Sequence, residues 1–210
     1  GAIVLANVGV NLSGTSSVLA AAFDGTVTEH TGTVTITNDD YTATQLKTIN
    51  AATTGAITLN DATGALSGTV ADIKAALAGN ITEHTGTITI SDNATTDVTA
   101  TDITTINTAS TGTITVSNAI DINGSGSEVA AAFAAINTNT GNATAHITGT
   151  DYTIAQLKAI NNATTGAIVL DTTTTALSGT VADIKLAFAG SVTTHTGTLE
   201  ITDAGTTDIT

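Results

Sequence analysis

Histidines are the first residues to consider for chemistry, because imidazole is the commonest protein ligand for transition metals. His30, His84 and His195 occupy equivalent positions of a repeated sequence. Such positions lie at least two strand spacings apart, about 9 to 10 Å, whereas the ligands of one ion must each lie within about 2.0 to 2.1 Å of it. We therefore expect separate histidines in turns or on the surface, without a shared metal. His146 aligns instead with Thr35 on a predicted strand.

Aspartates supply the hard oxygen ligands that calcium prefers. Asp92, Asp97 and Asp102 lie in the segment SDNATTDVTATD, and Asp203 and Asp208 repeat the start of it. The spacing lacks the glycine and the terminal glutamate of an EF-hand, and the glycine-rich calcium-binding nonapeptide is absent. We favour solvated loop acids that cap helices, and we keep a calcium site as the alternative.

Threonines alternate along several predicted strands and form candidate outward-facing rows. The rows are Thr33/Thr35/Thr37, Thr87/Thr89 and Thr113/Thr115, and the middle row is interrupted by Val4, His146, Val169 and Glu200. A flat Thr-x-Thr ladder is typical of some ice-binding solenoids. Because β-branched threonine is common on any exposed strand face, we favour an ordinary solvated face.

Recognisable catalytic motifs are absent from the sequence. It contains no P-loop, no G-x-G-x-x-G, no G-x-S-x-G and no pair of carboxylates in matching environments. We therefore expect a protein that is not an enzyme. We assign no catalytic, cofactor-binding or metal-binding residue, and we expect no cofactor.

The composition limits the possible partners. The formal net charge is −14, and the only basic residues besides histidine are four lysines. Phosphate backbones bind clustered basic residues, so nucleic acid is excluded as a partner. No run of about 18 apolar residues indicates a membrane span, and no signal peptide is recognisable. Threonine makes up roughly a quarter of the chain and aromatic residues only 2 %, which favours thin layers of aliphatic side chains.

An internal repeat organises the whole chain. The segment from Gly55 to Asp92 recurs from Gly166 to Asp203 with about two thirds of its residues unchanged, a period of 111. We interpret residues 1–210 as a single repeat array made of two super-repeats, 1–111 and 112–210. The absence of any methionine indicates a processed piece or a fragment of a longer protein.

Eight pentads with a period of two predict strands. They are Ala2 to Ala6, Thr33 to Thr37, Ala56 to Asn60, Thr87 to Ser91, Thr113 to Ser117, Thr144 to Thr148, Ala167 to Asp171 and Thr198 to Thr202. Their centres advance alternately by about 31 and about 23 to 26 residues, so long and short connections alternate. One face carries Ile, Leu and Val, as in Ile88/Ile90 and Leu199/Ile201, and is expected to be buried.

The connections carry helix signals. In the long ones, Thr69 and Thr180 precede Asp72 and Asp183 as acidic variants of a capping box, and the helices close near Gly79 or Gly190. In the short ones, Thr42/Gln45 and Thr153/Gln156 are capping boxes, and Asn50, Asn107 and Asn161 are expected to end the helices. Strand and helix in regular alternation predict parallel pairing and right-handed crossovers. The fold class is therefore α/β, a right-handed α/β solenoid (superhelix) with eight parallel strands alternating with helices.

The repeated sequence motifs resemble those of a known class of proteins. With VADIKAALAG, YTxxQLKxIN and TGAI(T/V)L, the sequence resembles the tandem repeats of very large cell-surface proteins of cyanobacteria and other aquatic bacteria. The resemblance covers essentially all of the chain but includes no catalytic motif. It implies a role in a surface layer, in motility or in an adhesive stalk, and it carries over no functional residue.

Together these observations predict a non-catalytic structural or adhesive repeat segment of a bacterial cell-surface protein, located extracellularly. The alternative is a binding module, either ice-binding or stiffened by calcium. Open sheet edges at both ends predict head-to-tail self-association, which the charge of −14 opposes at low salt.

Overall fold

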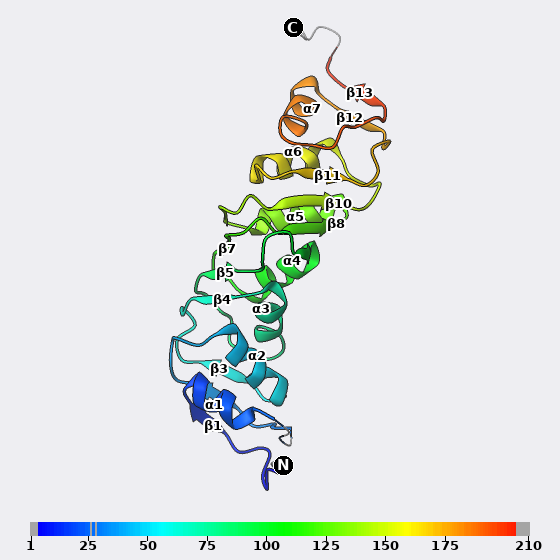
Figure 1. The fold of residues 1–210 in the computed structure, drawn as a ribbon. Helices are drawn as coiled ribbons and strands as arrows, with labels where there is room; N and C mark the ends of the chain where they lie inside the picture. Colours follow the sequence, from blue (N-terminus) through cyan, green and yellow to red (C-terminus); the bar gives the residue numbers. More distant parts are fainter. Residues whose placement is uncertain (1–3, 26, 28, 205–210) are drawn as a thin grey trace. The chain divides into compact units, whose positions relative to one another are not determined.

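The computed structural model describes residues 4–25, 27 and 29–204. Within these residues, parallel strands alternate with seven helices in an α/β fold, and the strands form several small sheets rather than a closed barrel (Figure 1). The chain divides into two compact units, Gly1–Ser91 with Thr105–Thr115, and Asp92–Thr104 with Val116–Thr210. The interpretation of the chain as a single repeat array stays a prediction.

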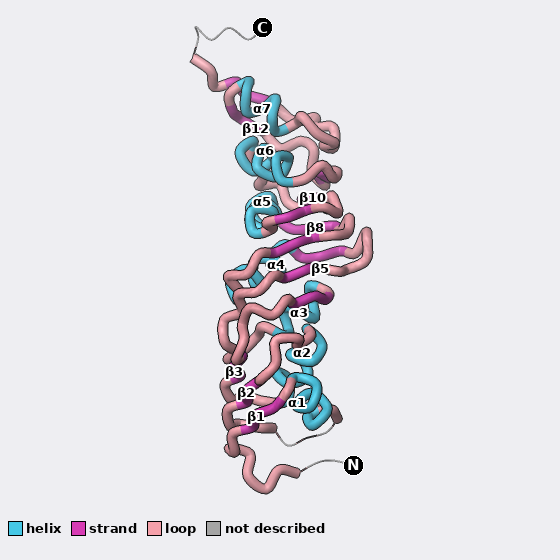
Figure 2. Tube along the Cα trace, turned by 90° about the vertical axis from the view of Figure 1, so that its left-hand side faces the viewer, coloured by secondary structure: helices cyan, strands magenta, loops and turns pink. Residues whose placement is uncertain are grey.

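The first unit contains two small parallel sheets and the helices that connect their strands. Its elements are β1 (Leu12–Gly14), α1 (Ser16–Phe23), β2 (Val34–Ile36), α2 (Ala43–Ala52), β3 (Ile57–Leu59), β4 (Leu66–Gly68), α3 (Val70–Ala76), β5 (Ile88–Ile90) and most of β7 (Ile114–Val116). Among the strands of this unit the orders are β1-β2-β3 and β4-β5-β7, the latter being three of the four strands of its sheet. Within this unit, α1 and α2 lie to one side of β1, β2 and β3 (Figure 2).

The second unit follows the same plan. Its elements are β6 (Asp97–Thr99), β8 (Asp121–Gly124), α5 (Gly126–Ala135), β9 (Thr138–Asn139), β10 (Thr144–Ile147), α6 (Ile154–Ala163), β11 (Ile168–Leu170), β12 (Leu177–Gly179), α7 (Val181–Ala187) and β13 (Leu199–Ile201). The strands form the sheets β11-β10-β8-β6 and β12-β13. Helix α4 (Ala100–Ala109) contributes residues to both units.

The expected number of eight strands is not confirmed, because the described residues form thirteen short strands. Seven predicted pentads contain a strand. Residues 1–3 of the first pentad lie outside the described residues, and residues 4–6 form no strand. The strands that the pentads missed include the three Leu-Ser-Gly segments β1, β4 and β12, which stand directly before helices. These segments are too short, and too rich in Ser and Gly, to show a period of two.

The predicted inner faces form the core wherever a neighbouring strand covers them. Ile88 and Ile90 are fully buried, and so are Leu46 and Ile49 on the inner side of α2. Each such side chain contributes about 1.5 to 3 kcal/mol relative to an exposed one. The prediction is wrong for β13, where Leu199 and Ile201 are 43 % and 54 % exposed, because no further strand of the described chain lies beside them.

Hydrogen bonds between successive segments have a regular sequence separation. They join residues about one strand-and-helix turn apart, as in Tyr41 to Asp61 (20 residues), His84 to Ser110 (26) and Ser16 to Gln45 (29). Glycines permit the closest of these approaches, since a Cβ at Gly55 would overlap the carbonyl oxygen of Gly32, and a Cβ at Gly112 that of Gly86. The backbone thus returns beside itself at short, regular intervals within each unit.

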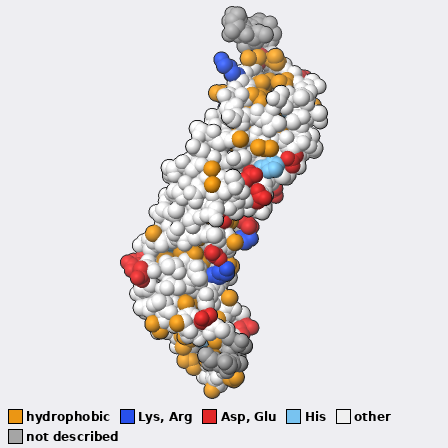
Figure 3. Space-filling view, viewed as in Figure 1, with side chains coloured by type: hydrophobic (Ala, Val, Ile, Leu, Met, Phe, Trp, Pro, Cys, Tyr) orange, Lys and Arg blue, Asp and Glu red, His pale blue; other side chains and the backbone are white. Residues whose placement is uncertain are grey.

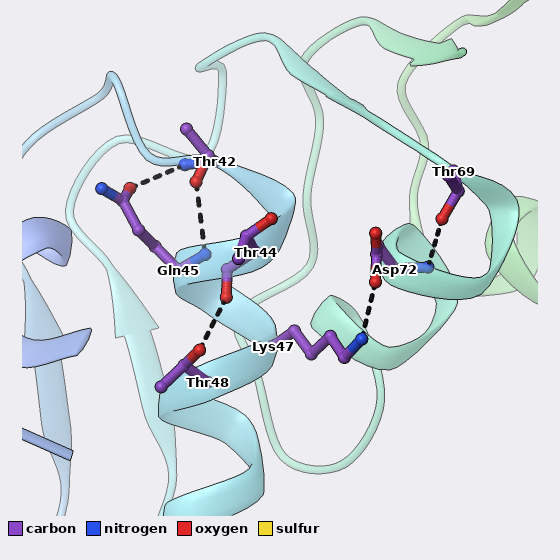
Figure 4. Close-up of polar contacts among 7 residues, drawn as sticks. All are labelled: Thr42, Thr44, Gln45, Lys47, Thr48, Thr69 and Asp72. Carbon is purple, nitrogen blue, oxygen red and sulfur yellow. Dashed lines mark hydrogen bonds and ion pairs between the residues drawn. The ribbon is translucent and has the colours of Figure 1, made fainter. Parts of the chain in front are cut away.

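Helix starts agree with the capping signals (Figure 4). Thr42 and Gln45 form a complete capping box at α2, and Thr153 and Gln156 form one at α6. At α3 only half of the box forms: Thr69 Oγ1 accepts a hydrogen bond from the backbone N–H of Asp72 (3.1 Å), while the Asp72 carboxylate contacts Lys47 Nζ of α2 (2.6 Å). Helix α5 begins with a third box, from Ser125 and Glu128, that the sequence reading missed.

The expectation that asparagines end the short-connection helices is wrong. Asn50, Asn107 and Asn161 all lie inside helices, two residues before the end. Asn50 Nδ2 donates to the carbonyl oxygen of Ala75 (2.8 Å), and Asn161 Nδ2 donates to that of Leu186 (2.9 Å). Asn50 and Asn161 therefore cap carbonyls in the last turn of the next helix, rather than forming a left-handed residue at the end of their own helix.

Candidate functional site

The expectation of a turn or surface position is wrong for two of the three equivalent histidines. His30 and His84 are only 1 % and 0 % exposed, and His195 is half-buried. No group of three or more metal-ligating side chains with the geometry to hold an ion exists among the described residues. Each histidine instead serves the local backbone.

His84 shows how such a histidine is held. Its Nε2 lies 2.8 Å from the carbonyl oxygen of Gly64, which can only accept, so Nε2 carries the proton. Burial lowers the pKa of the His84 imidazole and keeps it neutral. Its Nδ1 lies 3.2 Å from Ser110 Oγ, and the Ser110 hydroxyl donates to the backbone carbonyl oxygen of His84 (2.7 Å). His30 repeats the arrangement with Val10 O at 2.7 Å and Thr53 Oγ1 at 3.1 Å.

Aromatic rings cover the histidines. Tyr41 meets His84 edge-on with ring centroids 6.1 Å apart, and Tyr152 meets His195 in the same way at 6.4 Å. The Tyr41 hydroxyl donates to the carbonyl oxygen of Asp61 (3.1 Å), and burial raises the pKa of Tyr41 to about 12. These ring contacts are structural. Both imidazole nitrogens of His84 already have partners in Gly64 and Ser110.

The acidic residues are dispersed, and one of them caps a helix as expected. Asp203 Oδ2 accepts the backbone N–H of Val181 at the start of α7 (2.7 Å), and Asn38 does the same for Ser16 of α1 (2.6 Å). Asp92 is buried, Asp97 is exposed and Asp102 is half-buried, whereas Asp208 lies outside the described residues. Neither these acids nor the others described are gathered into a calcium site.

The threonine rows are short. In the first unit Thr35 stands in register between Ser13 and Thr58, and Thr89 pairs with Ser67. Thr113 Oγ1 donates to Thr87 Oγ1 (3.3 Å), so part of the hydroxyl row is occupied internally. Because each sheet contains only a few strands, no row extends far.

One grouping of ionisable side chains was not predicted from the sequence. His146, on the outward face of β10 as expected, lies between carboxylates from the two neighbouring strands. Its Nε2 is 2.7 Å from Asp171 Oδ1, just after β11, and its Nδ1 is 3.4 Å from Asp121 Oδ2, at the start of β8. Asp97 stands in register beside Asp121 on β6.

Hydrogen bonds and burial have opposing effects on the pKa values of His146 and Asp121. The hydrogen bond to Asp171 is the main cause that raises the pKa of His146. Burial also raises the pKa of Asp121, although His146 acts against it, and Asp121 Oδ1 is buried without a hydrogen-bond partner. The favoured state is an imidazolium that donates towards both acids and ties three strands together.

The four residues of this grouping have a nearly constant spacing in the sequence. Asp97, Asp121, His146 and Asp171 are separated by 24, 25 and 25 residues, which lies within two residues of the separations of 24, 23 and 23 between paired strand positions in this unit. The spacing alone does not show that these side chains meet, because that depends on the register in which the strands pair.

The arrangement offers little for catalysis. Both nitrogens of His146 face carboxylates, so neither is directed at a serine, threonine or water as a general base would be. Two lysines form ion pairs between neighbouring helices, Lys47 with Asp72 at 2.6 Å and Lys158 with Asp183 at 2.5 Å. On the face shown in Figure 3 lysine side chains are scattered rather than clustered.

Within the described part of the chain, no helix combines the length and the apolar character needed to cross a bilayer. Comparisons of the sequence with protein-family models and with curated proteins, and of the chain with solved structures, found no match.

Proposed function

We propose that the chain is a non-catalytic, structural or adhesive repeat segment of a bacterial cell-surface protein, folded as a right-handed α/β solenoid. One observation carries the proposal: in both units, inter-segment hydrogen bonds join residues about 20 to 29 positions apart, as Tyr41 to Asp61 and Tyr152 to Thr172 do. Bonds of this separation support a repeat array in which each turn contacts mainly its neighbours. Right-handed crossovers are the rule for parallel strands.

The chemistry of the side chains supports a structural role. The buried histidines bond to backbone carbonyls, two asparagines cap neighbouring helices, and two lysines pair with aspartates of the next helix. Polar residues that recur in the repeats are thereby occupied in joining successive turns. The protein then acts as a spacer whose length is set by the number of repeats.

The experiment that tests this proposal is duplication of the 111-residue super-repeat. A spacer built by stacking should gain length and unfolding surface in proportion to the added residues, because each turn contacts only its neighbours. The measurements are the maximum dimension from small-angle scattering and the m-value in urea. A longer chain whose dimension stays constant would contradict the solenoid.

Head-to-tail association belongs to the same proposal. The first unit exposes Val4, Val10 and Val18 by 79 %, 48 % and 64 %, and the second exposes Leu199 and Ile201. Two apolar surfaces of this kind favour contact between separate copies, while the charge of −14 opposes it.

A further inference from the structure

An open hollow of about 640 Å³ lies between α7 and β13. It is lined by Ile184, Lys185, Phe188, Ala189, His195 and Leu199, and we call it the α7/β13 socket. Hydrophobic side chains gather over this part of the chain in Figure 3.

The socket is a core surface without its cover. Residue for residue, the super-repeat places Leu199 and Ile201 where the first copy has Ile88 and Ile90. Those two isoleucines are fully buried, whereas Leu199 and Ile201 are 43 % and 54 % exposed. The same side-chain chemistry is thus buried at one position and open at the other.

The first unit shows what covers the equivalent surface. Strand β7 lies beside β5, and the backbone N–H of Ile88 donates to the carbonyl oxygen of Thr113 (2.8 Å). The hydroxyl of Ser110 reaches Nδ1 of His84, and the backbone N–H of Thr111 donates to the carbonyl oxygen of His84 (3.0 Å). One strand and the turn before it supply all of these contacts.

The corresponding groups of the socket lack partners among the described residues. His195 bonds through Nε2 to the carbonyl oxygen of Thr175 (2.8 Å), but no hydroxyl reaches its Nδ1. The backbone N–H of Leu199 has no acceptor in the described part of the chain. Lys185 forms no ion pair there either, although lysines at the same helical position, Lys47 and Lys158, each meet an aspartate of the next helix.

We propose that the α7/β13 socket binds a short-connection repeat turn with the chemistry of residues 100–118: a helix with an acid in its first turn, a Ser or Thr hydroxyl, and a parallel strand. This inference rests on the proposed repeat architecture and names the partner of its open surface. The hydroxyl bonds Nδ1 of His195, and a backbone carbonyl accepts the N–H of Leu199. An acid equivalent to Asp102, the third helical residue of α4, meets Lys185.

The test extends the chain after Thr210 with a copy of residues 100–118, ATDITTINTASTGTITVSN. We expect amide exchange at Leu199 to slow by at least about tenfold, because its N–H becomes hydrogen-bonded inside a covered sheet. The matched control carries the same extension with the copies of Ile103, Ile106 and Ile114 replaced by serine, and it should leave Leu199 unprotected. Equal exchange in both extended proteins would overturn the proposal.

A second variant tests the polar contact separately. An extension in which only the copy of Ser110 becomes alanine should still protect Leu199, but the ¹⁵N signal of His195 Nδ1 should stay at its value in the unextended chain. If the His195 Nδ1 signal changes only in the protein with the complete extension, the contact with the copied Ser110 hydroxyl is supported. Identical Nδ1 signals in the two extended proteins would contradict this contact.

Two further outcomes separate this proposal from its alternatives. If duplication of the super-repeat lengthens the protein as expected while the extension leaves Leu199 unprotected, the socket proposal fails and the spacer proposal stands. If Leu199 of the unextended chain becomes protected as protein concentration rises, the occupant is a second copy, and the assignment to a short-connection turn is overturned.

Discussion

Nδ1 of His84 lies 3.2 Å from Oγ of Ser110, a residue 26 positions further along the chain, and both side chains are buried. The bond joins two successive turns through side chains rather than through the strand ladder. Together with Nε2 bonding to Gly64 O, it makes the imidazole a bridge between the turn before it and the turn after it. Burying a polar ring is favourable only because both nitrogens are satisfied.

Replacing His84 with alanine should therefore destabilise the protein by about 3 kcal/mol, from the cavity and from the unsatisfied Gly64 carbonyl. His195→Ala is the matched control, since this ring is half-buried and has one bond fewer, and it should cost about 1 kcal/mol. Urea unfolding of the two variants checks the difference. Similar losses would show that the bridge to Ser110 contributes nothing.

Strand β5 provides a test of the assigned faces. Ile88→Asp places a charge in a fully buried site and should cost about 4 kcal/mol or more, whereas Thr89→Asp, on the half-exposed outward face, should change stability by less than about 1 kcal/mol. Circular dichroism melting curves measure both. Equal melting losses would show that the two faces are exchanged.

Calcium and EDTA should leave the melting temperature unchanged. The described acids are not assembled into a metal site, and Asp203 accepts a helix N–H instead. A ligand that binds only the folded state raises its stability with concentration. A saturable calcium-dependent increase of several degrees would therefore assign a ligand role to residues such as Asp92, Asp97 and Asp102.

Stability should depend on pH through His146. Because its folded pKa is raised by Asp171, its contribution is fully present below about pH 6.5 and is lost as pH rises through the folded pKa. The raised pKa of Asp121 acts in the same direction at lower pH. Between pH 6 and 8 the free energy of unfolding of the unmodified protein should fall by about 0.5 to 1 kcal/mol more than that of the His146→Gln variant. The effect is modest because solvent screens the ion pair. Parallel pH profiles would refute it.

Asp121→Asn separates the two acids around His146. Asp121 Oδ1 is buried without a partner and burial raises the pKa of this carboxyl, so the neutral amide should cost at most a few tenths of a kcal/mol at pH 7. Asp171→Asn removes the closer partner and should cost more, about 0.5 to 1 kcal/mol. A larger loss for Asp121→Asn would make Asp121 the main partner of His146.

Self-association should increase with salt. The exposed apolar residues of the two units favour contact between copies, whereas a net charge of −14 repels them at low ionic strength. Sedimentation velocity over a range of protein and salt concentrations measures the effect. Strictly monomeric behaviour under all conditions would rule out head-to-tail contact.

Local signals explain why much of the fold could be predicted. The caps at Thr42 and Thr153 depend on residues three positions apart, and the buried faces of β2 and β5 follow from alternation within a pentad. The Leu-Ser-Gly strands were missed because their pairing, rather than their own pattern, makes them strands.

The errors at polar residues share one physical cause, because the partner belongs to the adjacent turn. The sequence predicts a helix end at Asn50, but in the structure its side chain bonds to Ala75 of the next helix. It predicts a surface position for His84, but Gly64 and Ser110 of the adjacent turns contact its ring. The grouping of Asp121, His146 and Asp171 likewise depends on a strand register that the sequence does not state.

The close contact of Gly32 with Gly55, and of Gly86 with Gly112, has a consequence for how such a gene can change. A side chain at one of these glycines would force two turns apart, and each of the four glycines follows a threonine in the sequence. Recombination between gene copies aligned at these Thr-Gly steps would join one backbone path to an equivalent one. Whole turns could then be gained or lost without disturbing those that flank them.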